Sequence, residues 1–585
     1  MSEGKLAKWQ FELLFGLLAV LLVGLAAWVP ILQHLDGPAL AALAERQERR
    51  IIPLPGRPGD IYARTRRGQT LLAGSRQVPG VFADPKLLGA DRFADVAQKV
   101  AGAVGADANA IYENLLAHKG KEYVWLAHDL TDEQAAAVAR LKLRAVQVTH
   151  EWRRHYPNGA LASQLVGFRR IDGEPGAGME LQADAKLRPT DGVRVLRCDA
   201  GRRDRYIEVE QEIPAKDGSH VLLTIDVAIQ GYLESALSEC AGKFEPKAIM
   251  GVVLNCKTGE ILAISSWPTY DANEYWRATP DQLRLRSITD PYEPGSTFKP
   301  IIAVGSVEMG KATLESKFFC YHGMYASPKG GIIRDAPGER FGEIPLSEIV
   351  INSSNIGMAK LGELLGNPSL YRIATAFGYG VRSGVDIPGE CPGRLMPVSR
   401  WTSYDTVRLP FGQGQIMVTA LQLANGFATI ANGGTLYKPY VIDQIRTPEG
   451  GIVYQGASQS IRRVISQAVA KRFVDEVLVN VVEQGTGKKA LSDHWKIFGK
   501  TGTAQIGGPA GYADRAFTGS FVGGGPGSDP QIICVISVYH PNPAKGHFGG
   551  TVAAPYVKAV LEKSLSYLDV RPDKTVETQE DVAQR

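Results

Sequence analysis

The sequence contains little cysteine, and its cysteines and histidines are not grouped as metal ligands are. Six cysteines are spread over 585 residues. Neither Cys320-Tyr321-His322 nor the isolated His540 and His547 has further ligands nearby, which argues against a zinc centre, and no cysteine has a recognisable histidine partner that would make it a nucleophile. We therefore expect no metal and no cofactor. In an oxidising compartment a disulfide could form, but spacing does not choose the pair from Cys198, Cys240, Cys256, Cys320, Cys391 and Cys534.

A strong charge of either sign is also absent. The 65 basic and 61 acidic residues leave a net charge of +4, with histidine neutral. This is too small to argue for binding to nucleic acid. The hydrophobic content of 44% and the charged content of 22% are ordinary for a globular protein. The chain is too long for one ordinary core, so we expect two folded domains with attachments.

Long apolar runs are scarce, and the one that stands out lies near the N-terminus. Residues 13–32 are twenty residues without a charge, which is about the length of a helix that crosses a bilayer. Lys5 and Lys8 precede the run and favour a cytoplasmic N-terminus. A cleaved signal peptide is the alternative, because Gly24-Leu25-Ala26 offers a cleavage site, but the run continues well past it. We predict a cytoplasmic segment at 1–12, an uncleaved single-pass anchor at 13–32 in the inner (cytoplasmic) membrane, and the remaining chain in the periplasmic or extracytoplasmic space.

Three short polar signatures follow one another in the chain. Each is weak alone, because Ser2-Glu3-Gly4-Lys5 and Lys257-Thr258-Gly259 also match the first and third patterns. Together, and in this order, the three predict an acyl-transfer site built on a serine nucleophile. They are Ser296-Thr297-Phe298-Lys299, Ser353-Ser354-Asn355 and Lys500-Thr501-Gly502-Thr503.

The residues around Ser296 predict a helix that begins at the nucleophile. Pro294-Gly295 precedes it and the apolar run 301–304 follows, so we expect a helix from near Ser296 to near Met309. Residues three apart project from one face of a helix, so the Lys299 amine can reach the Ser296 hydroxyl. The free N–H groups and the positive dipole end at the start of the helix would also favour an oxyanion.

Context separates the two accidental matches from the signatures. Ser2 lies at a terminus ahead of the apolar run. Lys257 lies between two β-rich runs, 252–255 and 261–264, and so predicts a hairpin turn. Lys500 instead follows the run Trp495–Gly499 and leads into Thr503–Ile506. We therefore predict that it lies on a strand that lines a cleft.

The chemistry of acyl transfer explains why these residue types are needed. The Ser296 hydroxyl needs a base, and a lysine can serve only if its pKa is lowered by burial or by a second cation. We assign Lys299 as the base and Lys500 as the neighbouring cation. Ser353 would pass protons between the serine and the leaving or incoming amine. Asn355 would hold Lys299 and the substrate amide by hydrogen bonds.

The third signature is predicted to bind the substrate. Thr501, Gly502 and Thr503 form the binding segment, in which the two threonines join Lys500 in holding a substrate carboxylate. The backbone N–H groups of Ser296 and Thr503 would form the oxyanion hole. Taken singly, the signatures also fit a capped helix with an exposed lysine and a polar helix patch. Their combination favours the catalytic interpretation.

Hydrophobic patterns place the signatures in a mixed α+β domain. Residues 33–215 alternate short strands and helices and predict an elongated pedestal, with two β-rich runs between Arg194 and Glu212 and a linker at 215–218. We expect the catalytic domain at 216–571 and a disordered tail at 572–585. The catalytic domain is predicted to begin with a helix that Asp226 caps and to contain a long helical insert through about residue 485. Its strands are predicted at 250–266, 495–506, 516–524 and 531–540, as one antiparallel sheet with helices around it.

Further motifs make the chain resemble the class B penicillin-binding proteins, the monofunctional peptidoglycan transpeptidases. The resemblance covers nearly the whole chain. One motif departs from the family pattern: Ala63 stands where Asp is usual, and Thr65-Arg66-Arg67-Gly68 is longer than the usual Asn-Gly. The matching motifs are Arg57–Tyr62, Gly176–Glu180, Val221–Asp226 with Gln230, Thr258–Ala263, Arg286 with Thr289-Asp290, Tyr292–Ser296, Gly412–Gly414, Thr419 with Leu421–Leu423, and Ala431–Gly434.

The resemblance implies a fold, a substrate and partners. The fold would be that of the penicilloyl-serine transferases, which is α+β. The substrate would be a peptidoglycan stem peptide ending in D-Ala-D-Ala, joined through a Ser296 acyl-enzyme to an acceptor amine, and β-lactam antibiotics would acylate the same serine. We see no glycosyltransferase module, so the resemblance implies a SEDS-type membrane glycosyltransferase partner, with other divisome or elongasome membrane proteins. Pro555, Tyr567-Leu568 and Pro572 resemble the FtsI-type division enzymes more than the elongation type.

Other functions fit the same residues. A D,D-carboxypeptidase would send water to the acyl-enzyme. A β-lactamase would need a deacylating base, and we find no clear Glu-x-x-x-Asn pattern for one. A function of another class is a non-catalytic division scaffold or β-lactam sensor, in which the pedestal acts and the catalytic fold only binds.

Overall fold

The computed structural model describes residues 8–35, 37, 39, 41, 49–121, 123–143, 145–198, 206–508 and 511–574. Within these ranges the chain divides into two compact units. Unit 1 comprises residues up to 57 together with 189–217, and unit 2 comprises 58–188 together with the chain from 218 onward. The Ser2–Lys5 match, residues 1–7 of the predicted cytoplasmic segment and residues 575–585 of the predicted tail lie outside the described residues.

The N-terminal helix α1 (Lys8–Leu35) is long and apolar enough to cross a membrane. It has 28 residues, more than the roughly 20 that a bilayer requires, and its most apolar window has a mean hydropathy of 2.5. Its apolar side chains are exposed along its length. The helix contains the whole of the predicted anchor 13–32. A signal sequence near the N-terminus can also be long and apolar enough to cross a membrane, so the uncleaved anchor stays a prediction.

Unit 1 contains a three-stranded antiparallel sheet. Its order is β1 (Arg49–Leu54), β8 (Gly192–Cys198) and β9 (Tyr206–Ile213). Arg194 on β8 lies opposite Glu212 on β9, and its guanidinium donates two hydrogen bonds of 2.9 Å to that carboxylate. The two β-rich runs predicted between Arg194 and Glu212 are therefore confirmed as a hairpin pair.

The N-terminal part of unit 2 is a sheet covered by amphipathic helices. The long strand β3 (Gly68–Ala83) pairs with β2 (Ile61–Thr65), β4 (Val124–Ala127) and β5 (Val146–His155). Helix α4 (Phe93–Val104) buries residues three and four apart, and these pack with apolar side chains of α5 (Ala108–Ala117) and α6 (Asp132–Arg140) in one core. The residues that α4 buries are Phe93, Val96, Ala97, Val100, Ala101 and Val104.

This sheet continues into the C-terminal part of the chain. Strand β10 (His220–Asp226) pairs in parallel with β2 and antiparallel with β20 (Ile442–Arg446), which in turn pairs with β21 (Ile452–Gln455). The result is a seven-stranded sheet to which both predicted domains contribute strands. Residues 58–188 of the predicted pedestal are thus part of unit 2, and the predicted linker at 215–218 separates β9 from β10.

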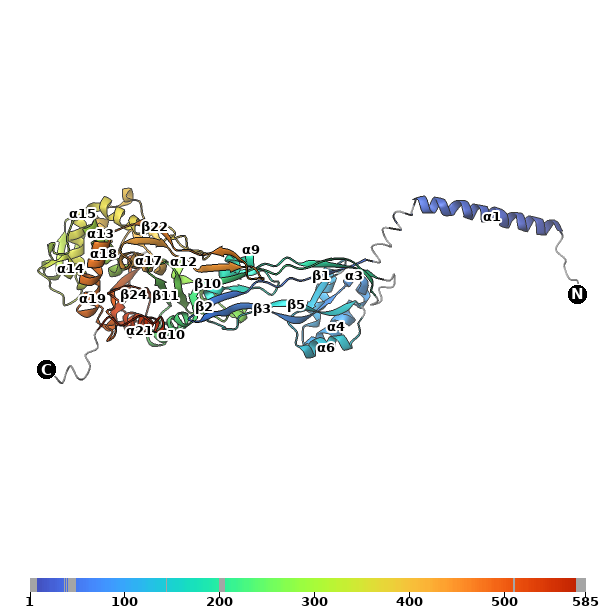
Figure 1. The fold of residues 1–585 in the computed structure, drawn as a ribbon, viewed down its shortest axis with the longest axis horizontal. Helices are drawn as coiled ribbons and strands as arrows, with labels where there is room; N and C mark the ends of the chain where they lie inside the picture. The colour runs from blue at the N-terminus through green and yellow to red at the C-terminus, as the bar shows by residue number, and fades with distance from the viewer. Residues whose placement is uncertain are drawn as a thin grey trace. The chain divides into compact units, whose positions relative to one another are not determined.

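The centre of unit 2 is a five-stranded antiparallel sheet, as the sequence predicts. Its order is β12 (Ile261–Trp267), β11 (Ala248–Asn255), β25 (Ile532–Tyr539), β24 (Gly511–Gly525) and β23 (Phe498–Gly508). Residues alternate between its two faces. Val253 and Cys534 face the core under α10 (Val227–Phe244) and α21 (Ala554–Tyr567), whereas Val252 and Val535 face the core that contains α17 (Ala420–Ala431) (Figure 1).

Two local predictions around this sheet are confirmed. The Asp226 carboxylate accepts hydrogen bonds from the backbone N–H groups of Ala228 and Ile229, at 2.9 and 3.2 Å, and so caps α10. Strands β11 and β12 form a hairpin with Lys257 in its turn. The Lys-Thr-Gly match at Lys257 is therefore part of a hairpin turn, and it is not a second copy of the signature at Lys500.

The predicted helical insert contains many short strand pairs between β12 and β23, and in this respect the prediction is wrong. These strands span two to five residues, too short for an alternating pattern to stand out from the neighbouring helical periodicity. The remaining elements of unit 2 are α3 (Pro85–Leu88), α7 (Ser163–Val166), β6 (Phe168–Arg169), β7 (Pro175–Ala177), α8 (Gly178–Gln182), α9 (Asp184–Leu187), α11 (Pro280–Leu283), α12 (Arg286–Thr289), α13 (Lys299–Glu308), β13 (Lys317–Phe319), β14 (Met324–Ser327), β15 (Gly331–Arg334), β16 (Glu343–Pro345), α14 (Leu346–Ile351), α15 (Asn355–Ala376), β17 (Arg394–Leu395), α16 (Ser403–Arg408), β18 (Ile416–Met417), β19 (Thr435–Lys438), β22 (Gln459–Arg463), α18 (Gln467–Phe473), α19 (Val479–Glu483) and α20 (Gly549–Val552), with short 3-10 and π turns between them.

Candidate active site

The nucleophile candidate Ser296 lies on a tight turn that leads into a buried helix. The turn is one 3-10 segment, η3 (Gly295–Phe298), and α13 begins at Lys299 and ends at Glu308. The predicted single helix is therefore a 3-10 turn followed by an α-helix. Gly295 has φ +54°, and a Cβ there would lie 3.2 Å from the Cβ of Ala504 on β23. A glycine is thus needed for the turn to lie against that strand.

Lys299 is fully buried, and its amine contacts the second signature. The Nζ atom donates hydrogen bonds to the Ser353 carbonyl at 2.5 Å, to Ser353 Oγ at 3.1 Å and to Asn355 Oδ1 at 2.8 Å. Burial lowers the pKa of Lys299 to about 7, although the carboxylate of Asp335 acts in the opposite direction. A large fraction of Lys299 is therefore uncharged at neutral pH and able to accept a proton.

The direct bond between Ser296 and Lys299 that the spacing predicts is not formed here. Among the described residues the Ser296 hydroxyl has no hydrogen-bond partner, while the Lys299 amine is held by Ser353 and Asn355. Catalytic hydrogen bonds often tighten only when substrate binds. The structure therefore holds the Lys299 amine in place three residues after Ser296, and its role as the base stays a prediction.

The second signature lies where α14 ends and α15 begins. Ser353 has φ +63°, a left-handed conformation that non-glycine residues adopt at a cost of about 1–2 kcal/mol. Ser354 is the N-cap of α15, and its hydroxyl accepts the Gly357 N–H at 3.0 Å. The turn aims both the Ser353 carbonyl and the Asn355 side chain at Lys299.

Asp335 is a buried acidic residue of this site that the sequence did not reveal. Its carboxylate accepts hydrogen bonds from the Ser354 hydroxyl at 3.0 Å, from the Asn355 N–H at 2.6 Å and from the Ile356 N–H at 3.0 Å. An anion at the positive end of α15 is favourable. Asp335 precedes the signature by 18 positions, and no local pattern connects the two, since the contact depends on the β14–β15 hairpin folding back.

Lys500 is also fully buried, on β23, and its pKa lies well below the ordinary value. Burial is the main cause, and the charge of Lys299 adds to it. The Nζ atom donates to the carbonyl and hydroxyl oxygens of Thr501, both at 3.3 Å. Thr501 Oγ1 also lies 2.7 Å from the hydroxyl of Thr486, which sequence reasoning missed. Simultaneous protonation of the two lysine amines is therefore unfavourable.

Gly502 and Thr503 bring β23 against the nucleophile turn. A Cβ on Gly502 would lie 2.8 Å from Thr297 Cγ2 and 3.1 Å from the Pro294 carbonyl oxygen, so a larger residue would force the strand and the turn apart. Thr503 Oγ1 accepts the Gly549 N–H at the start of α20, at 3.1 Å. The first and third signatures are thus in contact, and Lys299 connects the first to the second.

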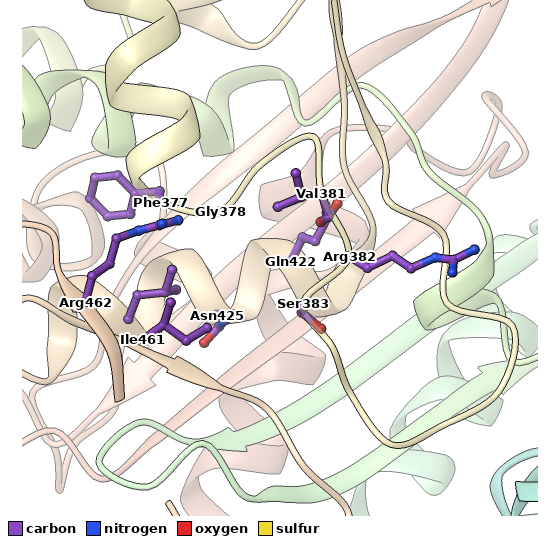
Figure 2. A pocket seen from close by; sticks show the side chains of 10 residues that line it. Phe377, Gly378, Val381, Arg382, Ser383, Gln422, Asn425, Ile461 and Arg462 are labelled. Carbon is purple, nitrogen blue, oxygen red and sulfur yellow. The ribbon is translucent and has the colours of Figure 1, made fainter. Parts of the chain in front are cut away.

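A separate small cavity in unit 2 contains none of the signature residues. Figure 2 shows that its lining comes from the chain just after α15, from α17 and from β22. Gln422 and Asn425 contribute polar groups, but their amide nitrogens already donate to the backbone carbonyls of Val381 and Tyr437. The cavity gives no reason to move the site away from the three signatures.

The cysteines and histidines that the structure describes are not grouped as metal ligands. Within the described ranges no group of three or more His, Cys, Asp or Glu side chains is arranged to hold a metal ion. The described cysteine side chains are free thiols, and that of Cys198 lies outside the described atoms. The free thiols are Cys240, Cys256, Cys320, Cys391 and Cys534.

Two family models match the chain. Residues 249–562 match the penicillin binding protein transpeptidase domain, and residues 53–171 match the penicillin-binding protein dimerisation domain.

Similar proteins match along most of the chain. Stage V sporulation protein D of Bacillus subtilis is 31% identical over 569 residues, which is 96% of this chain and 86% of that protein. The peptidoglycan D,D-transpeptidase FtsI of Escherichia coli is 28% identical over 571 residues, 97% of this chain and 93% of that protein. The crystal structure of a peptidoglycan synthetase from Bifidobacterium adolescentis has a TM-score of 0.71 at 25% identity, covering 90% of this chain and 98% of that one. The α+β transpeptidase fold predicted from the sequence is confirmed, and the chain belongs to the penicillin-binding protein transpeptidase family.

Proposed function

We propose that the protein is a peptidoglycan D,D-transpeptidase that cross-links stem peptides through an acyl-enzyme on Ser296. The observation that carries this proposal is the fully buried Lys299, whose pKa is lowered to about 7 and whose amine is held by Ser353 and Asn355. The hydroxyl of a serine nucleophile requires a nearby base, and an uncharged lysine amine can serve as that base.

The acylation step follows from this arrangement. Ser296 Oγ attacks the carbonyl of the penultimate D-alanine while its proton passes to Lys299 Nζ. The N–H groups of Ser296 and Thr503 stabilise the tetrahedral oxyanion. When the intermediate collapses, the peptide C–N bond breaks, and the departing D-alanine amine takes the proton by way of Ser353. The donor peptide remains joined to Ser296 as an ester.

Deacylation completes the cross-link. An amine from a neighbouring strand attacks the ester carbonyl and loses its proton through Ser353 and Lys299, and Ser296 leaves with a proton restored to its oxygen. Lys500, Thr501 and Thr503 hold the donor carboxylate before acylation. Gly502 keeps this strand close to the nucleophile turn.

Mass spectrometry of the penicillin-labelled protein tests the proposal. We expect a lasting adduct on the peptide that contains Ser296 and none on the Ser296→Ala variant, with dimeric product when donor and acceptor stem peptides are mixed. Rapid loss of the label would indicate a β-lactamase, and a monomeric hydrolysed product alone would indicate a carboxypeptidase. A cell that grows and cross-links normally with Ser296→Ala, but not with pedestal variants, would show a scaffold or sensor.

The cellular setting is part of the same proposal. We place residues 1–12 in the cytoplasm, the anchor in the inner membrane and the catalytic domain outside, in cell division of the FtsI type. The similarity to the peptidoglycan D,D-transpeptidase FtsI supports the FtsI-type role. Protease accessibility of the catalytic domain in intact spheroplasts tests the orientation.

A polymerising partner completes the proposal. Because the recognised domains are the transpeptidase and dimerisation domains, the glycan substrate would come from a SEDS-type membrane glycosyltransferase, together with other divisome or elongasome membrane proteins. Co-reconstitution in vesicles with such a polymerase and lipid-linked precursor should yield cross-linked glycan. Cross-linking by the protein alone, from monomeric precursor, would contradict the requirement for a partner.

A further inference from the structure

A group of aromatic side chains with exposed rings lies directly behind the second signature. We define the aromatic site as Phe319, Tyr321 and His322. It begins at Phe319, the last residue of strand β13, and it is continuous with the second signature, because Ser354 Oγ lies 3.5 Å from the sulfur of Cys320. The β14–β15 hairpin also contacts the second signature, because Asn355 Nδ2 donates to the Arg334 carbonyl at 2.9 Å.

The backbone at this site is held in an unfavourable conformation. Tyr321 and His322 have φ values of +49° and +50°. Two consecutive non-glycine residues in the left-handed region cost about 1–2 kcal/mol each. The His322 N–H is fixed by the Phe341 carbonyl at 2.9 Å, and the Cys320 N–H by the Gly342 carbonyl at 2.7 Å. Strain of this kind persists where a side chain must be presented in one particular direction.

The ring of Tyr321 is supported from one side and open on the other. It stacks on Tyr325, with centroids 4.6 Å apart and planes 25° apart. Tyr325 is itself buried, and its hydroxyl donates to the Glu363 carboxylate at 2.9 Å. Tyr321 keeps 41% of its surface exposed and Phe319 keeps 44%. Phe319 meets the edges of Tyr321 and His322 with centroids 5.0 and 5.5 Å away.

The chemistry of this surface suits a sugar ring. An aromatic face carries negative potential and attracts the weakly positive C–H groups on the flat face of a pyranose. The tyrosine hydroxyl and the His322 ring can bond the polar edge of the same sugar. The segments that carry and follow these rings contain exposed residues of both charges, namely Lys317, Arg334, Glu339, Arg340 and Glu343, so the local sequence does not favour a ligand of one strong charge.

We propose that the aromatic site binds an N-acetylated hexosamine unit of the glycan strand whose stem peptide is being cross-linked. This inference rests on the proposed function, because a stem peptide in the catalytic site brings its own sugar chain with it. The site would position the strand, while Ser296, Lys299 and the other signature residues act on the peptide.

The test compares binding and kinetics of the full-length chain in detergent micelles. A tetramer of β-1,4-linked N-acetylglucosamine and stem-free glycan strands serve as probes, with saturation-transfer NMR and calorimetry as readouts. Tyr321→Asn removes the ring but retains a residue that tolerates the left-handed backbone, so folding is preserved. We expect it to weaken sugar binding about tenfold, whereas Tyr321→Phe, which keeps the ring and loses only the hydroxyl, should weaken it less. Trp276→Ala, which removes another exposed ring, 66% exposed, should have no effect.

The kinetic arm separates this inference from the proposed function. For a donor attached to polymeric glycan, Tyr321→Asn should raise KM about tenfold with kcat nearly unchanged, while a free stem peptide and penicillin should react as with the wild type. Absence of sugar binding by the wild type, or an equal loss of activity on all three substrates, would overturn the glycan site. Loss of a protein partner in Tyr321→Asn with sugar binding intact would also overturn it and show a protein-docking surface. Failure of penicillin to label Ser296 would overturn the proposed function alone.

Discussion

At the scale of single residues, the site depends on amines that are buried without a charged partner in contact. Lys299 and Lys500 are both fully buried, and for each of them burial is the main cause of a lowered pKa. Their hydrogen bonds go to carbonyl, hydroxyl and amide oxygens. A neutral amine is well solvated by such groups, whereas an ammonium would prefer a carboxylate in contact. The fold thus favours the form of Lys299 that can accept a proton.

The pH dependence of acylation should report the ionisation of Lys299. Because the pKa is lowered to about 7, the amine gains a proton as the pH falls through that value and can no longer act as a base. We expect the second-order rate constant for penicillin acylation to rise with pH and level off above about pH 8. Lys299→Arg, which stays charged, should lose at least about 100-fold. Lys257→Ala, in the accidental Lys-Thr-Gly turn, should keep the wild-type profile, and a rate independent of pH in this range would exclude Lys299 as the base.

The second prediction concerns Asp335, whose carboxylate accepts hydrogen bonds from the second signature and raises the pKa of Lys299. Asp335→Asn removes the charge that raises the Lys299 pKa, so the midpoint of the acylation profile should move to lower pH. Asp335→Ala removes the acceptor of the Asn355 and Ile356 N–H groups and should reduce the free energy of unfolding by about 1–3 kcal/mol. Stopped-flow acylation and thermal unfolding measure the two effects. An unchanged midpoint in Asp335→Asn would show that the carboxylate serves only as a helix cap.

At the scale of elements, the sequence predicts what has a local pattern. The strand at 531–540 is a continuous apolar run, as is typical of a strand buried on both faces. The hairpin at Lys257 has turn residues between two β-rich runs, and the helix after Asp226 begins with a capping residue. The 3-10 turn at Ser296 and the short strand pairs span too few residues to show such a pattern. Asp335 and Thr486 join the site only through folding, which no spacing along the chain can reveal.

The approach of β23 to the nucleophile turn gives a prediction for Gly502. A Cβ there would lie 2.6 Å from Ser520 Oγ and 2.8 Å from Thr297 Cγ2, so Gly502→Ala should push the strand away from Ser296. We expect penicillin acylation to fall about 100-fold and stability to fall by about 1–3 kcal/mol. Gly507→Ala on the same strand, where a Cβ would have nothing within 4 Å, is the matched control. Equal acylation rates for the two variants would show that this contact does not position the site.

At the scale of the whole molecule, unit 2 joins parts of the chain that the sequence assigns to different domains. Strand β10 lies between β2 and β20, so the dimerisation-domain segment and the transpeptidase domain share one hydrogen-bonded sheet. Arg64 on β2 strengthens this connection, because its guanidinium lies 2.9 Å from the Glu260 carboxylate and 2.8 Å from that of Asp443. Composition alone could not show this, since a parallel pairing between distant strands has no local signature.

The last prediction concerns the cooperativity of unit 2. Removing Arg64 leaves two partly buried carboxylates without their shared cation, a change that costs more than the loss of an exposed pair. Arg64→Met should lower the melting temperature of the full-length chain by several degrees, about 1–3 kcal/mol, and residues 58–188 should begin to unfold before the transpeptidase domain, as followed by hydrogen exchange. Arg66→Ala, which breaks an exposed pair with Asp569, should change stability by less than about 1 kcal/mol. If both variants melt like the wild type in one transition, the shared sheet alone holds unit 2 together, and the Arg64 ion pairs do not contribute to its cooperativity.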